Sequence, residues 1–123
     1  MQFDALSNLV IGCALEVHRQ LGPGLLESAY EAALAYELEQ QGISHERQVE
    51  LPVLYKGSHL NCKYRLDMVV EGELLLELKS VDGIEPIHEA QLLTYLKLSG
   101  LRTGLIINFN ETLLKKGIKR RVM

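Results

Sequence analysis

Three charged side chains interrupt the most apolar part of the sequence, the segment YRLDMVVEGELLLELKS at residues 64–80. Asp67 lies in the first of its two apolar runs, and Glu77 and Lys79 lie in the second. Side chains alternate between the two faces of a strand, so Glu77 and Lys79 share one face. Two carboxylates can hold a hard divalent cation such as Mg²⁺, and a nearby lysine can polarise a metal-bound water or stabilise developing negative charge. These residue types therefore suit metal-assisted chemistry.

The register of the hairpin that these two runs form decides whether the acids meet. A three-residue turn at residues 71–73, with a glycine or a bulge at positive φ, pairs Val70 with Leu74. This register gathers six apolar side chains on one face: Leu66, Met68, Val70, Leu74, Leu76 and Leu78. It also places Asp67 across from Glu77, where opposed Cβ atoms are about 4.5–5.5 Å apart and like charges repel. A proton or a shared cation would relieve that repulsion.

The alternative is an amphipathic hairpin whose charged face is solvated. Arg65 and Lys79 would then balance the two acids, as charged residues do on many exposed surfaces. The spacing Asp-x₉-Glu-x-Lys is only moderately specific, and taken alone it leaves both interpretations open.

The rest of the chain supplies the elements that must position this hairpin. Helical periodicity flanks the central strands, and the run TGLIINF predicts a strand buried on both faces. The predicted helices span residues 4–20, 25–41 and 86–99, and the predicted strands span residues 47–55, 59–70, 74–80 and 103–109. This order predicts one α/β domain over residues 1–123, in which an antiparallel meander leads through a crossover helix into a parallel strand of a mixed sheet. The basic tail KKGIKRR, at residues 115–121, could supply phosphate contacts, but a solvated C-terminus is the favoured interpretation.

Composition narrows the class of protein. Of the 123 residues, 47% are apolar and 24% are charged, which is typical of a soluble globular protein. No apolar run approaches the roughly 20 residues that a membrane span needs. Cys13 and Cys62 lack metal-ligand spacing, which indicates reduced thiols in a cytoplasmic protein. The net charge of −3 gives no basic footprint of the kind that strong general nucleic-acid binders carry.

Two predicted helices add polar residues that could face the hairpin. Glu27 lies beside Tyr30 at the flank of an apolar stripe, either as a boundary residue or as a carboxylate aimed into a cleft. His88, Gln91 and Tyr95 form a polar row on the leucine-rich third helix. Taken singly, each of these three is also explained as a first-turn, surface or core residue.

Four segments of the chain, VHRQLGPGLLESAYE, DMVVEGELLLELKS, HEAQLLTYLK and GLIINF, together resemble the GxxExxY protein family. Its Gly-x-x-Glu-x-x-Tyr signature is matched by Gly24, Glu27 and Tyr30. That family is grouped with the PD-(D/E)XK nuclease-like superfamily. The resemblance implies a restriction-endonuclease-like core of helix, three-stranded meander, helix and strand, here with an extra N-terminal helix. Leu66 precedes Asp67 where the superfamily name has proline, a position that varies.

The resemblance also implies a site. The implied ligands for Mg²⁺ or Mn²⁺ are Asp67, Glu77, the backbone carbonyl of Leu78 and, directly or through water, Glu27. Lys79 would orient the attacking water and stabilise the charge that develops on the substrate. The implied substrate-positioning residues are Gln91, Tyr95 and His88.

The function that the resemblance implies is metal-dependent hydrolysis of nucleic-acid phosphodiester bonds, with DNA favoured over RNA. The alternative is a non-catalytic nucleic-acid or protein interaction module on the same scaffold, which would explain the acidic net charge. A third reading is a homodimer, or a complex with a larger partner that supplies the grip on the substrate. With two Phe, five Tyr and no Trp, the chain gives little indication of single-strand binding by stacking.

Overall fold

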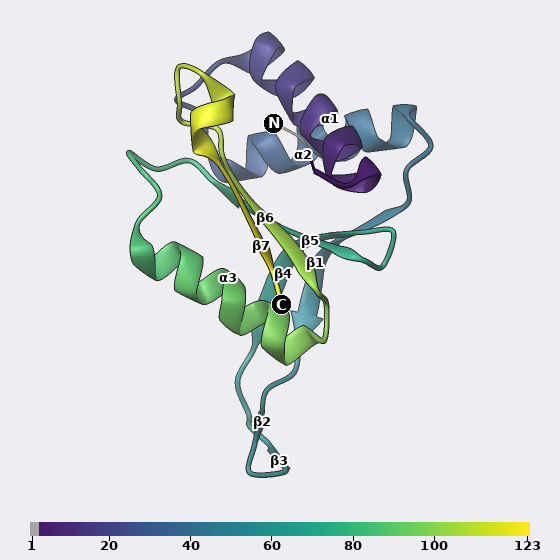
Figure 1. Ribbon diagram of the computed structural model, residues 1–123, viewed down its shortest axis with the longest axis vertical. Helices are drawn as coiled ribbons and strands as arrows, with labels where there is room; N and C mark the ends of the chain where they lie inside the picture. The colour runs from purple at the N-terminus through teal and green to yellow at the C-terminus, as the bar shows by residue number, and fades with distance from the viewer. Residues whose placement is uncertain (1–2) are drawn as a thin grey trace.

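A five-stranded mixed sheet with helices on both of its faces forms the body of the protein (Figure 1). The computed structural model describes residues 3–123. The helices are α1 (Ala5–Leu21), α2 (Glu27–Gln40), α3 (Pro86–Ser99) and a short 3₁₀ helix, η1 (Leu114–Gly117). The strands are β1 (His45–Leu51), β2 (Leu54–Tyr55), β3 (Ser58–His59), β4 (Tyr64–Val70), β5 (Leu74–Lys79), β6 (Thr103–Asn108) and β7 (Ile118–Val122).

The strand order in the main sheet is β1-β4-β5-β6-β7. β1, β4 and β5 pair antiparallel, and β6 lies parallel to β5 after the crossover through α3. β7 then pairs antiparallel with β6. The predicted α/β class is confirmed, with its meander, crossover helix and parallel strand and with the additional N-terminal helix. Within the described part of the chain, no helix combines the length and the apolar character that crossing a bilayer requires.

Each face of the sheet has its own apolar core. α1 and α2 cover one face, where Leu34 packs in a cluster with Leu76. α3 covers the other face, where Leu92 packs in a cluster with Leu75. Because both faces are covered, the LLLEL run of β5 is buried along its whole length. The solvated-face alternative is therefore wrong for Glu77, which is only 5% exposed, whereas Arg65 is exposed as that alternative expects.

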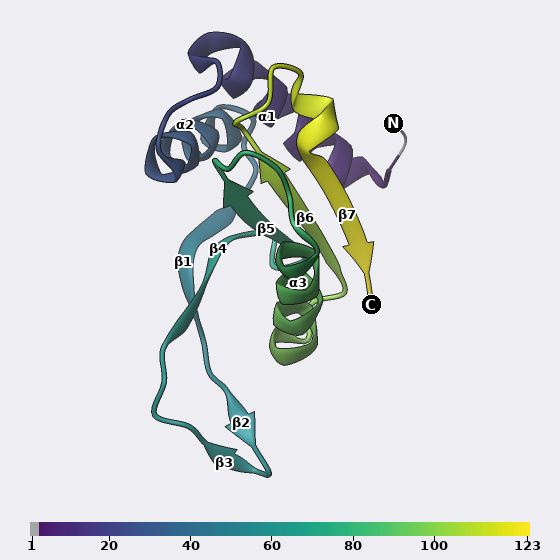
Figure 2. The same ribbon diagram turned by 90° about the vertical axis from the view of Figure 1, so that its left-hand side faces the viewer.

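The two predicted strands on either side of the YKGSH turn are each interrupted. The ladder between β1 and β4 ends at the pair Leu51 and Tyr64. Pro52 follows, and it has no N–H with which to extend the ladder. β2 and β3 then form a separate two-stranded sheet, which extends away from the rest of the molecule (Figure 2). We call residues 52–63 the arm.

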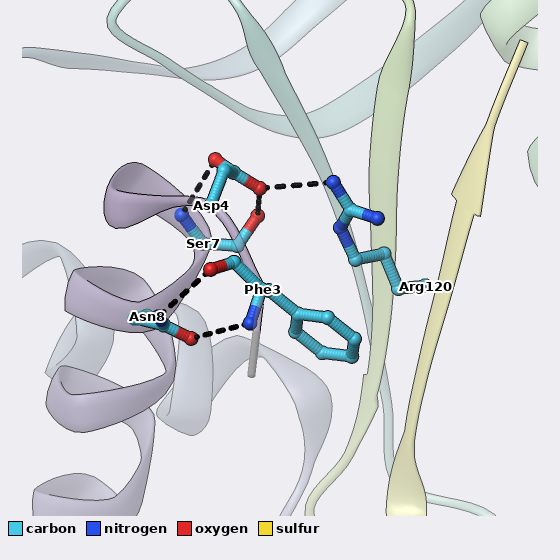
Figure 3. A network of polar contacts seen from close by, with 5 residues as sticks. All are labelled: Phe3, Asp4, Ser7, Asn8 and Arg120. Atoms are coloured by element: carbon cyan, nitrogen blue, oxygen red, sulfur yellow. Dashed lines mark hydrogen bonds and ion pairs between the residues drawn. The ribbon is translucent and has the colours of Figure 1, made fainter. Parts of the chain in front are cut away.

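The basic tail runs from η1 into strand β7, so the expectation of a solvated tail is wrong for part of it. Ile118 is buried, which the run of charges around it concealed. Figure 3 shows Arg120 of β7 reaching the start of α1, where its guanidinium lies 3.0 Å from the carboxylate of Asp4. That carboxylate also caps α1 by accepting hydrogen bonds from the N–H and hydroxyl of Ser7. Three lysines of the tail remain exposed: Lys115, Lys116 and Lys119.

Candidate active site

Asp67 and Glu77 lie on the neighbouring strands β4 and β5, in the register that the three-residue turn predicts. The pair next to them in the hairpin is Met68 with Leu76. The paired residues end there, and Oδ2 of Asp67 accepts a hydrogen bond from the backbone N–H of Leu78 at 2.8 Å. The Asp67 side chain thus takes a hydrogen bond of the kind that strand carbonyls usually accept. The carboxylate is held against β5, beside Glu77.

The regular alternation of β4 breaks next to Asp67. Met68 belongs to the core under α1 and α2, but Leu66 packs in the core under α3. This corrects the expectation that both residues share one face. On the adjacent strand, Gln48 has a φ of 51°, in the left-handed region that residues other than glycine rarely adopt. Backbone strain of this kind is concentrated at functional sites in proteins.

Glu77 is a buried acid, and one of its oxygens lacks a partner. Oε1 is buried and makes no hydrogen bond. Burial, and after it the charge of Asp67, raises the pKa of Glu77 to about 9, while the charge of Lys79 acts in the opposite direction. Without a cation, Glu77 therefore keeps its proton at neutral pH. A bound cation would supply the missing partner and favour the ionised form.

Glu27 is the first residue of α2 and faces the same cavity as Asp67. The cavity has a volume of about 210 Å³ and is lined by Glu27, Ser28, Glu31, Gln48, Asp67 and Leu78. Glu27 is exposed, so its side chain is free to change rotamer. The structure thus brings three of the predicted ligands, Glu27, Asp67 and Leu78, around one cavity. Glu77 adjoins Asp67 but does not line that cavity.

Tyr30 holds the loop that leads into α2. Its hydroxyl donates a hydrogen bond to the carbonyl of Gly22 at 2.6 Å and accepts one from the N–H of Leu25 at 3.0 Å. Ser80, just after β5, donates a hydrogen bond to the carbonyl of Leu25 at 2.6 Å. These contacts tie the loop to the end of β5 and so fix where Glu27 begins its helix. The tyrosine of the Gly-x-x-Glu-x-x-Tyr signature positions the glutamate.

We expect Tyr30→Phe to lower the free energy of unfolding by about 1–3 kcal/mol, because two backbone groups lose their partner. The ring would still stack on Phe109, at the present centroid distance of 4.5 Å, so the loss reports the hydroxyl alone. Chemical denaturation measures the change. Tyr36→Phe is the matched control, because Tyr36 is 59% exposed. Equal stability of the two variants would show that the hydroxyl does not hold the loop.

Lys79 and Tyr95 lie near Glu77, and Gln91 is hydrogen-bonded to Tyr95. Lys79 lies two residues beyond Glu77 at the end of β5, and its charge favours the ionised form of that acid. On α3, Nε2 of Gln91 donates a hydrogen bond to the hydroxyl of Tyr95 at 3.0 Å. Burial, and next the charge of Glu77, raises the pKa of Tyr95. Together with Tyr64, Gln91 and Tyr95 line a second hollow of about 390 Å³.

His88 is engaged at the start of α3. Its Nδ1 accepts a hydrogen bond from the N–H of Glu85 at 2.9 Å, which completes a capping box. It does not line the hollow that Gln91 and Tyr95 share. Helix capping accounts for the position of His88.

Sequence reasoning missed Glu31 and Gln48 of the first cavity. Glu31 is 9% exposed and accepts hydrogen bonds from Nε of Arg47 at 3.1 Å and from Nε2 of Gln48 at 2.7 Å. Consecutive side chains of a regular strand point to opposite faces. Arg47 and Gln48 can both reach Glu31 because the backbone of Gln48 is in the left-handed region. The four-residue spacing from Glu27 to Glu31 was an available signal, since it places both acids on one helix face. The sequence around Gln48 gives no such signal.

A sequence model described as the PD-(D/E)XK nuclease superfamily matches residues 4–121. The chain belongs to the PD-(D/E)XK nuclease superfamily. A solved structure described as "Crystal structure of SSO0001" is similar in fold, with a TM-score of 0.56 and 15% sequence identity. The similarity covers 99% of this chain and 79% of that one. The curated proteins gave no match to the chain.

PD-(D/E)XK nucleases generally use divalent metal ions, and Asp67 with the adjacent Glu77 supplies carboxylates of the kind that such an ion binds. Among residues 3–123, no three His, Cys, Asp or Glu side chains are grouped so that they could hold a metal ion by themselves. Mg²⁺ needs only one or two carboxylates, since it keeps several waters. The unpartnered Oε1 of Glu77, beside Asp67, meets that requirement. Glu27 faces the same cavity as Asp67 and would join directly or through water.

Proposed function

We propose that this PD-(D/E)XK protein hydrolyses nucleic-acid phosphodiester bonds, with Mg²⁺ or Mn²⁺ held by Asp67 and Glu77. The observation that carries the proposal is the buried carboxyl oxygen of Glu77 that lacks a hydrogen-bond partner beside a second acid. Burying such a group without a partner costs free energy, so it does not serve stability. An acid whose pKa is strongly perturbed by burial and a neighbouring charge is typical of a functional site.

The chain supplies oxygen ligands from two elements. Asp67, Glu77 and the carbonyl of Leu78 come from the central hairpin, and Glu27 comes from the first turn of α2. The N–H of Leu78 fixes the orientation of the Asp67 carboxylate. A bound metal ion lowers the pKa of its water and offsets the negative charge of the attacked phosphate.

Lys79 orients the attacking water and stabilises the negative charge of the pentacovalent phosphorus. The water oxygen forms a bond to phosphorus while the bond to the leaving oxygen breaks. One proton of the water passes to solvent, and the leaving oxygen takes a proton from solvent. Gln91 and Tyr95, which are hydrogen-bonded to each other on α3, position the substrate backbone or Lys79.

A non-catalytic interaction module is the second candidate function. Two observations favour it: the net charge of −3, and the lack of a three-ligand cluster among residues 3–123. A module of this kind would gain nothing from Glu77, because an apolar residue in its place would avoid the cost of burying an acid. The buried acid therefore favours the enzyme.

Incubation with linear and circular, single- and double-stranded DNA and RNA distinguishes the two functions. We expect cleavage in Mg²⁺ or Mn²⁺ and none in EDTA. The Glu77→Gln variant, purified in the same way, should lose metal-dependent cleavage and so controls for contaminating nucleases. Binding without cleavage in every metal condition would favour the interaction module. Cleavage that persists in Glu77→Gln would show that the reaction occurs elsewhere.

A further inference from the structure

The arm is basic, although the protein as a whole is acidic. The arm contains Lys56 and Lys63 but no Asp or Glu, and Arg65 follows it near the start of β4. All three are exposed, and the formal net charge of the whole chain is −3. Both ribbon views show that residues 52–63 project beyond the helices and the main sheet (Figures 1 and 2). Two of these positive charges thus lie on the protruding segment, and the third lies near the start of β4.

Aromatic rings accompany these charges. Tyr55, in the arm, is 59% exposed, and the Nζ of Lys56 lies 5.5 Å from the centre of its ring. Tyr64, where β4 begins, is 48% exposed, and its ring centre is 6.3 Å from that of Tyr95. Nucleic-acid bases stack on exposed aromatic rings largely irrespective of base identity. The chain has few aromatic residues, but two of its five tyrosines lie at or beside the arm.

A hollow lies at the base of the arm, beside α3. It lies between Val53 and Tyr64 on one side and Gln91 and Tyr95 on α3, with a volume of about 390 Å³. Arg65 and the catalytic-site acid Asp67 lie two residues apart on β4. A polynucleotide held along the arm would therefore lie beside this hollow and near Arg65, two residues from Asp67 on β4.

We propose that the arm grips the nucleic acid next to the bond to be cleaved. Lys56, Lys63 and Arg65 bind backbone phosphates, and Tyr55 and Tyr64 stack on unpaired bases. The inference rests on the proposed function, since the substrate of that function is the partner of the arm. The positive charge of the arm favours a polyanion as its partner and disfavours the equally basic arm of a second copy of the chain. The exposed rings select a partner with unpaired bases.

Binding of fluorescently labelled DNA, single-stranded and duplex, tests the charges of the arm. The measurement uses protein carrying Glu77→Gln in EDTA, so that no cleavage intervenes. Lys56→Ala, Lys63→Ala and Arg65→Ala are combined in one variant. We expect Kd for the single strand to rise at least about tenfold at low salt, and the slope of log affinity against log salt to become shallower by about 2.

The matched control is the combination Lys115→Ala, Lys116→Ala and Lys119→Ala, which removes the same charge from exposed positions of the tail. We expect it to bind nearly as tightly as the parent. An equal loss of affinity in the two triple variants would overturn the inference. Lys56→Ala alone replaces the triple variant if the latter does not fold.

Tyr55→Ser tests stacking separately from charge. We expect its Kd for single-stranded DNA to rise about fivefold or more, with an unchanged salt slope. Tyr36→Ser is the control, because Tyr36 on α2 has the same exposed fraction of 59%. Equal affinities for the Tyr55 and Tyr36 variants would contradict stacking on the arm.

The outcomes separate this inference from the proposed function. Binding that depends on the arm, with no cleavage by the wild type, would support the inference and refute the enzyme. Cleavage by the wild type, with unchanged binding by the arm variant, would refute the inference alone. A change in oligomeric state of the arm variant without weaker DNA binding would identify the arm as a contact between copies, and the inference would be wrong.

Discussion

The metal-free protein is expected to gain at least about 2 kcal/mol of stability at pH 8 when Glu77 is replaced by glutamine. The pKa of Glu77 is about 9 in the folded protein and 4.5 for an unperturbed glutamate. Between these values the folded state keeps a proton that the unfolded state releases. Stability of the wild type therefore falls as pH rises from about 4.5 to about 9. Glutamine fills the same space without an ionisable group, so it removes this loss.

Urea denaturation in EDTA at several pH values between 5 and 9 measures this effect. We expect the stability difference between Glu77→Gln and the wild type to increase with pH. Glu73→Gln is the control, because Glu73 is an exposed acid in the turn of the same hairpin. Mg²⁺ should then stabilise the wild type but not Glu77→Gln, since only a group that binds the folded state shifts its stability. A stability difference that does not depend on pH would contradict a protonated, buried Glu77.

Replacement of Lys79 by methionine is expected to slow cleavage by about 10²–10³-fold while metal binding persists. The magnitude is that found when one group that stabilises developing charge is removed from an active site. Lys79 is not among the proposed ligands, so the stabilisation of the folded protein by Mg²⁺ should remain. Cleavage rates and melting temperatures in Mg²⁺ separate the two roles.

Lys97→Met is the control for Lys79→Met, because Lys97 is an exposed lysine on α3. A full cleavage rate in Lys79→Met would remove Lys79 from the reaction. Loss of the Mg²⁺ effect together with cleavage would instead mean that the substitution disturbs the two acids.

The central hairpin could be predicted from sequence because its register must place the apolar side chains of both strands on one face. Only the three-residue turn gathers the leucines of β5 with Met68 and Val70, and the structure has that register. The same reasoning failed for Leu66, because it assumed that β4 alternates regularly up to its start. The break beside Gln48 depends on the left-handed backbone of a residue whose type gives no warning of it.

β7 was missed because its sequence lacks the pattern of a buried strand. β7 presents only one fully buried residue, Ile118, among four that are more exposed. Its place in the sheet depends on pairing with β6 and on the contact of Arg120 with Asp4. Such partners are distant in sequence and leave no local periodicity. The arm was expected as parts of two long strands, since strand propensity continues through the position where Pro52 ends the ladder.

Binding of Mn²⁺ in crystals tests the central claim most directly, because anomalous scattering locates this ion without reference to activity. Crystals of the wild type soaked in Mn²⁺ should show an anomalous peak coordinated by carboxylate oxygens of both Asp67 and Glu77. Crystals of Glu77→Gln should lose that peak or show it greatly weakened. A peak elsewhere, or none between these acids at saturating Mn²⁺, would contradict the metal site proposed for this protein.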